Sequence, residues 1–283
     1  MVVKLDLHVH TLSRGVVFID APGLKRAIMA RGLDGVAVTN FFDIEHALWL
    51  QAKLPEHKII VGQEVWTSDG HVIGLGITRR VRDLQPARKT VEEIHAQGGV
   101  AVAVHPFMMH GLGDKAIEAG VDAIEVYNGL LGRLMIFNMR ADFWAKQHRL
   151  PRLSSGDTSS AKYVGWNQTH VKVDSPQGIL EAICQGKTSL VRRALPLPWI
   201  FAAKNILGFS HVKPWPVHAA PCLVCGEAWI VRLQQQERAC MACGVVERSH
   251  LACCRGHYYC VPCLVAIGHR RALELRQQEY LSS

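Results

Sequence analysis

The sequence lacks any long hydrophobic run. No stretch in its 283 residues approaches the length of about 18 consecutive apolar residues that a membrane-spanning helix needs. The opening MVVKLDLHVH also has no basic segment followed by an apolar core, which is the pattern of an export signal. We therefore expect a cytoplasmic protein with no membrane partner. Its 49% hydrophobic content supplies enough apolar side chain for a full core.

Runs of like charge are missing as well. The formal net charge is +8, a balance that often accompanies nucleic-acid binding. The basic residues are scattered along the chain, however, and none of their runs reaches five residues. Charge alone therefore does not favour nucleic acid as the partner.

Cysteine is missing before Cys184 and then gathers near the end of the chain. Eight of the nine cysteines fall between Cys222 and Cys263. In a chain without an export signal, pairs with two residues between them indicate metal binding, because both sulfurs reach one tetrahedral zinc ion. The pairs are Cys222/Cys225, Cys240/Cys243, Cys254/His257 and Cys260/Cys263, with Cys253 as an alternative to Cys254.

Four such pairs predict two structural zinc ions in a small module over residues 222–283. Adjacent pairs share an ion, or alternate pairs interleave in a cross-braced manner, and the sequence leaves both arrangements open. The module holds seven Arg and no Lys against five Asp or Glu, and zinc-bound thiolates remove further positive charge. It resembles a small, poorly characterised zinc-binding domain found fused to enzymes. We expect it to contact a protein partner rather than nucleic acid.

Upstream of this module, short β-branched runs alternate with helical patterns. This alternation predicts an α/β fold, with a parallel sheet or barrel flanked by helices. The expected strands cover residues 2–10, 34–40, 57–65, 71–77, 99–107, 122–128, 150–157 and 169–174, and the expected helices cover 21–32, 44–54, 90–98, 138–149 and 176–186.

Polar residues recur at or just past the ends of these strands. In a parallel β/α barrel the carboxyl ends of the strands converge on one face, where functional sites are built. We therefore expect these residues to meet. They are His8, His10, Asn40, Glu64, His105, Asn128 and Asp157.

Two of these residues, His8 and His10, lie two positions apart on one expected strand, so both side chains point to the same face. Two neighbouring imidazoles suit the ligands of a cation better than they suit an apolar core. With a carboxylate that can bridge two cations, such a set is typical of a two-metal hydrolytic centre. The other donors of the expected centre are Glu64, His71, His105 and Asp157.

The order of motifs over roughly residues 3–195 resembles the polymerase and histidinol phosphatase (PHP) family of metal-dependent phosphoesterases. The resemblance implies a distorted (β/α)7 barrel with metals at the carboxyl ends of its strands. The motifs that carry it are DLHVHTLSRG, VTNFFD, GQEV, HVIGLG, AVHPF, IEVYN and SGDTSS.

The resemblance also implies how the metal ligands are shared. The first cation would use His8, His10, Glu64 and Asp157, and the second would use Glu64, His71 and His105. The metals would be Mn, Fe or Zn, which these donors all suit.

A third cation is common in the family, but its expected ligand positions hold Arg14, Phe41 and Ser159 here, and Asn40 replaces an aspartate. We therefore expect two cations, with the Arg14 guanidinium binding phosphate oxygens in place of the third. Asn128 matches a family residue that lines the pocket, where it would hold the substrate or a metal-bound water.

The expected function is metal-dependent hydrolysis of a phosphate ester by a water that two metals activate. The alternative is an inactive PHP-fold binding or regulatory protein whose zinc module contacts protein or nucleic acid. A nuclease is a third, less favoured reading.

The domain organisation follows from a change of pattern near residue 190. We expect the barrel over residues 1–195, a proline-rich linker over 196–221 and the two-zinc module with a terminal helix over 222–283.

Overall fold

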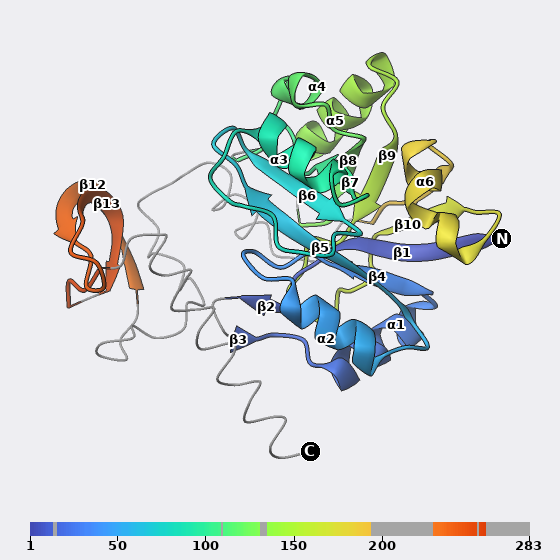
Figure 1. Cartoon of the computed structure of the whole chain (residues 1–283), viewed down its shortest axis with the longest axis horizontal. Coiled ribbons are helices and arrows are strands. Elements are labelled where there is room, and N and C mark those ends of the chain that lie inside the picture. Colours follow the sequence, from blue (N-terminus) through green and yellow to red (C-terminus); the bar gives the residue numbers. More distant parts are fainter. Residues whose placement is uncertain (14–15, 109, 131–134, 194–228, 254, 259–283) are drawn as a thin grey trace. The chain divides into compact units, whose positions relative to one another are not determined.

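The computed structural model of the chain describes residues 1–13, 16–108, 110–130, 135–193, 229–253 and 255–258 (Figure 1). The chain divides into two compact units, and the first of them holds the large sheet and its helices. The predicted domain boundaries lie outside the described residues and stay predictions. No helix of the described segments is both long enough and apolar enough to cross a membrane.

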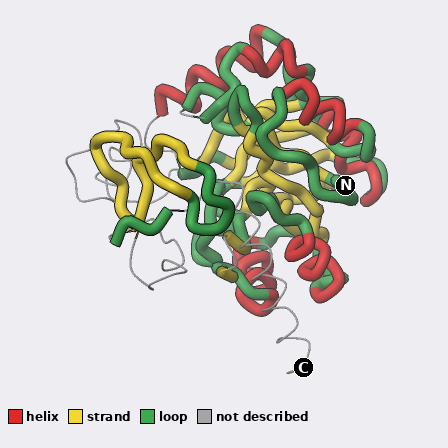
Figure 2. Tube along the Cα trace, turned by 60° about the vertical axis from the view of Figure 1, so that its left-hand side comes forward, coloured by secondary structure: helices red, strands yellow, loops and turns green. Residues whose placement is uncertain are grey.

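A nine-stranded sheet forms the centre of the first unit, with helices around it (Figure 2). Its strands follow the order β11-β10-β1-β4-β5-β6-β7-β8-β9. In chain order they are β1 (Val2–Val9), β4 (Gly35–Val38), β5 (Lys58–Trp66), β6 (His71–Leu75), β7 (Val100–Ala103), β8 (Ala123–Asn128), β9 (Arg152–Ser155), β10 (Gln168–Lys172) and β11 (Thr188–Val191).

The sheet curls into a nearly closed barrel because its last strand returns to its first three. In β9, the Ser154 amide donates to Thr169 Oγ1 on β10 at 2.9 Å, and the Ser154 hydroxyl donates to the Val191 carbonyl on β11 at 2.8 Å. Just beyond β9, the Thr158 carbonyl accepts from the His10 amide at 2.9 Å. The predicted barrel is therefore confirmed.

The strands do not all run in one direction, which corrects the expected parallel sheet. β1, β4 and β5 are mutually parallel, as are β7, β8 and β9, but β6 is antiparallel to both of its neighbours. The turn between Trp66 and His71 is too short for a crossover, so it can only join antiparallel strands. Since β6 separates β5 from β7, both parallel groups run in one direction and end at one face. The strand β10 is a second reversed strand, antiparallel to both β1 and β11.

Among the described residues, six helices and several short elements accompany the sheet, and they include all five expected helices. The α1 helix is well capped, because Asp20 Oδ1 accepts from the Gly23 amide at 2.7 Å and Gly32 ends the helix at a φ of 60°. The elements are β2 (Leu12–Ser13), β3 (Val16–Val17), α1 (Ala21–Arg31), α2 (Glu45–Lys53), α3 (Ala87–His95), α4 (Lys115–Ala119), α5 (Met135–Gln147), the 3-10 turn η1 (Pro176–Gly178) and α6 (Ile179–Cys184).

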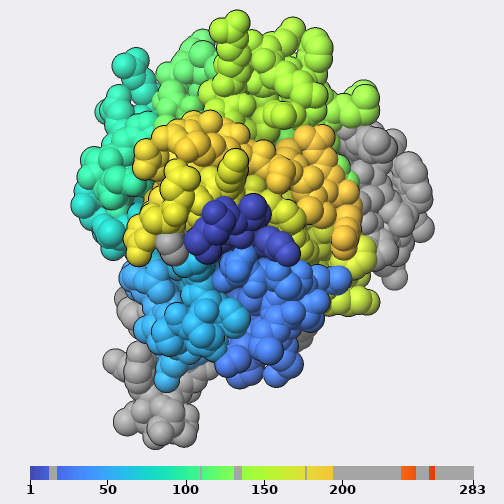
Figure 3. Space-filling view, turned by 90° about the vertical axis from the view of Figure 1, so that its right-hand side faces the viewer, coloured from blue at the N-terminus to red at the C-terminus, as the bar shows by residue number. Residues whose placement is uncertain are grey.

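The amino-terminal strand lies inside the sheet rather than at an edge. Its first residues lie between the 170–190 region and the α1–α2 region (Figure 3). The Met1 ammonium donates to the Val173 carbonyl at 2.7 Å, and the Lys4 amide donates to Asp34 at 2.7 Å. Both neighbours therefore fix β1, which carries the first two candidate ligands.

The second unit contains an antiparallel hairpin of β12 (Trp229–Ala239) and β13 (Val246–Cys253). Its turn holds Cys240, which is buried, and Cys243, which is exposed. The backbone of this turn is closed by Cys240, whose amide donates to the Val245 carbonyl and whose carbonyl accepts from Gly244. The described part also includes His257. Five expected zinc ligands lie outside the described residues: Cys222, Cys225, Cys254, Cys260 and Cys263. The two-zinc module thus stays a prediction.

Candidate metal centre

Six side chains predicted from the sequence meet at the carboxyl ends of the parallel strands. Five of them follow from strand direction, because each lies at or just past such an end. His71 is the exception, because it is the first residue of the antiparallel β6, and an antiparallel strand begins at the face where its neighbours end. The six are His8, His10, Glu64, His71, His105 and Asp157.

Glu64 lies between two pairs of histidines, and each of its oxygens faces a different pair. Glu64 Oε2 is 3.1 Å from His8 Nε2 and 3.1 Å from His10 Nε2. Glu64 Oε1 is 2.8 Å from His71 Nδ1 and 3.2 Å from His105 Nε2. The carboxylate is only 1% exposed. This is the geometry of a carboxylate that bridges two cation positions.

Asp157 completes the first pair. Its Oδ1 atom lies 3.5 Å from His8 Nε2 and 3.5 Å from His10 Nε2. The Asn128 amide donates to its other oxygen at 2.9 Å, so Asn128 holds a candidate ligand in place. The predicted contact of Asn128 with a substrate stays a prediction.

The pKa values at this centre reflect closely spaced opposite charges. Burial alone would raise the pKa of Glu64, but the charge of His8 and hydrogen bonds from the other imidazoles lower it well below its usual value. Burial would likewise raise the pKa of Asp157, but the charge of His8 together with the hydrogen bond and charge of His10 lowers that pKa. Both carboxylates are therefore ionised at neutral pH, which is the form that binds cations.

A further buried carboxylate, Glu125 on β8, was not predicted from the sequence. Its Oε1 atom lies 2.9 Å from His8 Nδ1, and its Oε2 atom accepts from the His105 amide at 2.8 Å. The side chains of Asn128 and Ser155 also donate to it. A carboxylate on the far nitrogen of a ligating histidine fixes the ring orientation and strengthens the ligand.

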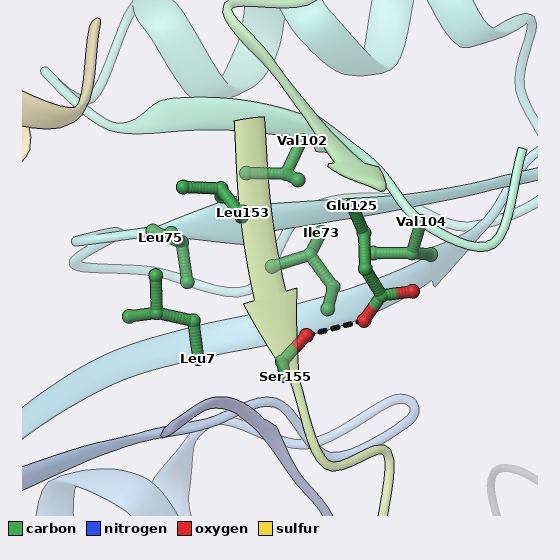
Figure 4. A pocket seen from close by; sticks show the side chains of 8 residues that line it. All are labelled: Leu7, Ile73, Leu75, Val102, Val104, Glu125, Leu153 and Ser155. Carbon is green, nitrogen blue, oxygen red and sulfur yellow. Dashed lines mark hydrogen bonds between the residues drawn. The ribbon is translucent and has the colours of Figure 1, made fainter. Parts of the chain in front are cut away.

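Beneath Glu125 the barrel interior is apolar (Figure 4). Glu125 and Ser155 point toward one another at the edge of a cavity of about 10 Å³, which is room for about one water molecule. The register between β1 and β4 shifts between Asp6 and Val9, and this shift lets Leu7 line the cavity while the next residue, His8, still reaches Glu125. The other lining residues are Ile73, Leu75, Val102, Val104 and Leu153.

Backbone strain gathers around the same centre. His105 has a φ of 32° and Asp157 a φ of 47°, both in the left-handed region. Two neighbours, Phe42 and His110, share this conformation with φ values of 58° and 71°. Each such residue costs of order 1 kcal/mol, and such strain concentrates at functional sites.

At the expected third metal position, the residues that the structure describes make other contacts or face solvent. Asn40 Oδ1 accepts from the amides of Thr11 and Leu12 at 2.8 and 3.0 Å, so it fastens the chain after β1. Phe41 is apolar and stacks on the His10 ring at a centroid distance of 4.7 Å. Ser159 is exposed, and Arg14 lies outside the described residues.

The donor set fits a pair of divalent cations. The donor atoms of His8, His10 and Glu64 lie within 4.8 Å of one another, and those of Glu64, His71 and His105 do the same. Imidazole nitrogen and carboxylate oxygen are the ligands that Mn, Fe and Zn share. Glu64 belongs to both groups, as a bridging ligand must.

No protein-family sequence profile matches the chain. The uncharacterised protein MJ1587 of Methanocaldococcus jannaschii is 30% identical in an alignment 139 residues long, which covers 44% of this chain and 81% of that protein.

Three solved structures share the fold. A two-domain protein of Bacteroides vulgatus, which contains a predicted PHP-like metal-dependent phosphoesterase, has a TM-score of 0.55 at 16% identity, over 90% of this chain and 88% of that one. PsfC of Pseudomonas syringae has a TM-score of 0.54 at 18% identity, over 68% and 92%. Endonuclease Q, bound to a 27-mer duplex with an abasic lesion, has a TM-score of 0.50 at 14% identity, over 97% and 72%.

These likenesses confirm, at the level of fold, the resemblance that the motifs indicated. The chain belongs to the same family as the M. jannaschii protein, and its barrel has the PHP-like metal-dependent phosphoesterase fold.

Proposed function

We propose that the barrel is a two-metal phosphoesterase that hydrolyses a phosphate ester. The observation that carries this proposal is the placement of Glu64, whose two oxygens face separate histidine pairs at 2.8 to 3.2 Å. The PHP-type fold of the barrel supports the same class of chemistry. A bound cation pair would supply positive charge for phosphate oxygens and a water activated near neutral pH.

The protein's own residues hold and orient this centre. Glu64, His8, His10 and Asp157 would hold one cation, and Glu64 with His71 and His105 would hold the other. Glu125 accepts from the His8 ring and from the His105 backbone, so it sets the direction of donors to both positions. Asn128 keeps Asp157 turned toward the first position.

We propose two cations rather than three because two of the residues at the expected third position are poor metal ligands here. The Asn40 oxygen already accepts two backbone hydrogen bonds, and the Phe41 ring offers no donor atom. Arg14 is proposed to bind the phosphate oxygens, where its guanidinium would supply charge that a third metal supplies elsewhere.

The test is metal analysis of the purified protein together with a screen of phosphomonoesters and phosphodiesters. We expect two metals in the barrel and hydrolysis of at least one ester class. His10→Ala should lose one metal and lower kcat by at least 100-fold. His95→Ala is the matched control, because His95 is an exposed residue at the end of α3 and pairs with Asp122 rather than with a candidate ligand. Activity that survives His10→Ala would reject the proposal.

A second candidate is a PHP-fold protein that binds metals and ligands without turnover. Phe41 favours it, because its ring covers one face of His10 and approaches His71 edge-on at 5.8 Å. This candidate predicts two bound metals, no hydrolysis in the screen and none gained by Phe41→Ala.

A further inference from the structure

An open groove with a volume of about 410 Å³ lies along α1 and the segment that follows β9. Small side chains on one face of the helix leave this hollow, and three cationic side chains border it. The cations are Arg26, Arg31 and Lys162, and the small residues are Gly23, Ala27, Ala30 and Ala161.

The lining of the groove has positive charge and no negative charge. None of its residues is acidic, and in the described part of the chain no ion pair is formed by Arg26, Arg31 or Lys162. The neighbouring Lys25, by contrast, is paired with Glu56 at 2.6 Å. Cations without acidic partners, gathered in a hollow, leave their charge available for an anionic ligand.

Two contacts hold the Arg31 side chain in place. Its guanidinium lies 4.6 Å from the centre of the Trp166 ring, and it donates to the Lys162 carbonyl at 3.2 Å. The segment that carries Lys162 is fastened at both ends, because Asp6 accepts from the amides of Gly156 and Gly165, each at 2.8 Å. The groove is therefore built on fixed backbone.

The same segment connects the groove to the metal centre. It begins at Asp157, and Lys162 follows five residues later, a stretch of chain that spans at most about 18 Å. A nucleic-acid duplex carries a phosphate on each strand every 3.4 Å or so of helix axis. A strand with one phosphate at the metal pair would thus have several others within reach of the groove.

We propose that this groove binds the phosphate backbone of a nucleic-acid strand whose scissile phosphodiester lies at the metal centre. The inference deepens the proposed phosphoesterase function by naming a polynucleotide as the substrate class. Arg26 and Lys162 contact phosphates electrostatically, and the fixed Arg31 supplies a planar guanidinium for bidentate contact.

The first measurement is binding of fluorescent 20-mer DNA and RNA strands to the full chain in EDTA, so that it does not depend on hydrolysis. We expect the double variant Arg26→Glu/Lys162→Glu to weaken binding at least tenfold. Losing two contacts to single-stranded phosphates should also reduce the slope of log affinity against log salt by about 1.4. The matched control is Arg79→Glu/Lys89→Glu, which reverses two exposed cations elsewhere, and it should change affinity less than twofold.

The second measurement compares two substrates with metal present. The groove variant should cleave the 20-mer at least tenfold more slowly than wild type, with hydrolysis of bis(p-nitrophenyl) phosphate unchanged. Absence of all hydrolysis in wild type would reject the phosphoesterase function. The binding measurement in EDTA would still test the groove, because it does not depend on hydrolysis. Unaltered strand binding in the groove variant, or a wild-type groove that takes inorganic phosphate but no strand, would overturn the inference.

Discussion

Glu125 shows how a single buried side chain sets the properties of a metal site that it does not enter. It is 1% exposed and receives hydrogen bonds from His8, His105, Asn128 and Ser155. His8 and His105 are candidate ligands themselves, and Asn128 positions a third one, Asp157. The Glu125 carboxylate therefore acts on the site through the orientation of the histidines.

Glu125→Gln should lower metal affinity 10- to 100-fold, because an amide is a weaker acceptor for the His8 ring than a carboxylate. The free energy of unfolding of the metal-free protein should change much less, since the shape of the side chain is kept. Affinity is measured by titration against a chelating dye. Glu118→Gln, on the exposed face of α4, is the control, and equal affinity in both variants would contradict the positioning role.

The candidate ligands were predictable because polar residues that end apolar strands stand out in the sequence. Glu125 did not stand out, because it lies in the middle of β8, where Ile124 and Val126 are both fully buried. A strand buried on both faces shows no alternation that would mark one residue as facing a site. A carboxylate within such an apolar run, like Asp6 in β1, is the signal that could have revealed it.

The strand β6 illustrates which parts of the fold could be predicted from the sequence and which could not. Strands and helices were found from their periodicity, but strand direction depends on the length of the connection and not on the strand itself. The TSDG turn between Trp66 and His71 gives β6 its reversed direction and carries His71 to the ligand face. The edge strand β11 was missed because its four residues are only partly buried or exposed and give no clear pattern.

The end of helix α1 offers a test of backbone conformation alone. Gly32 has a φ of 60°, and a Cβ atom placed there would meet nothing within 4 Å. Gly32→Ala should therefore cost only the left-handed conformation, about 1 kcal/mol.

Gly165 combines the same conformation with a crowded neighbourhood. Its φ is 71°, and an added Cβ would lie 2.6 Å from Leu33 and 3.0 Å from Arg31. Gly165→Ala should cost roughly 2 to 3 kcal/mol, because steric overlap adds to the conformational cost. Urea unfolding of both variants measures the difference, and equal losses would show that crowding adds nothing here.

For the molecule as a whole, the metal pair should stabilise the fold, because its candidate ligands come from β1, β5 and β6 and from the segments after β7 and β9. A ligand that binds only the folded state adds about 2.7 kcal/mol to the free energy of unfolding when present at 100 times its Kd. We expect Tm to rise on adding Mn²⁺ and to fall in EDTA. Glu64→Ala should abolish the rise, and a rise of the same size in that variant would place the metal elsewhere.

Acid should weaken the ion pairs of Asp142, which connect α5 with β9 and with the residue after β11. Asp142 on α5 pairs with Lys146 at 2.8 Å, with Arg192 at 2.9 Å and with Arg152 at 3.0 Å. Burial alone would raise the pKa of Asp142, but these cations lower it to about 2 from an ordinary 3.8. The pairing therefore stabilises the fold above pH 3.8, and this contribution is lost as pH falls toward 2.

Asp142→Asn should lower the free energy of unfolding by about 1 kcal/mol at pH 7, after allowance for solvent screening. The difference from wild type should shrink as the pH falls through this window. Denaturant unfolding at pH 7 and pH 3 measures it, with Asp174→Asn as the control at a 98% exposed carboxylate. A difference that is constant with pH would refute the assignment.

The position of β1 between β4 and β10 has a consequence for how the protein is made. The ribosome releases β1 long before β10, which ends at Lys172. At 5 to 20 residues per second, the delay lasts roughly ten to thirty seconds. Throughout this interval β1 lacks the strand that later pairs with its second edge, so the backbone groups of that edge stay open to pairing with another chain.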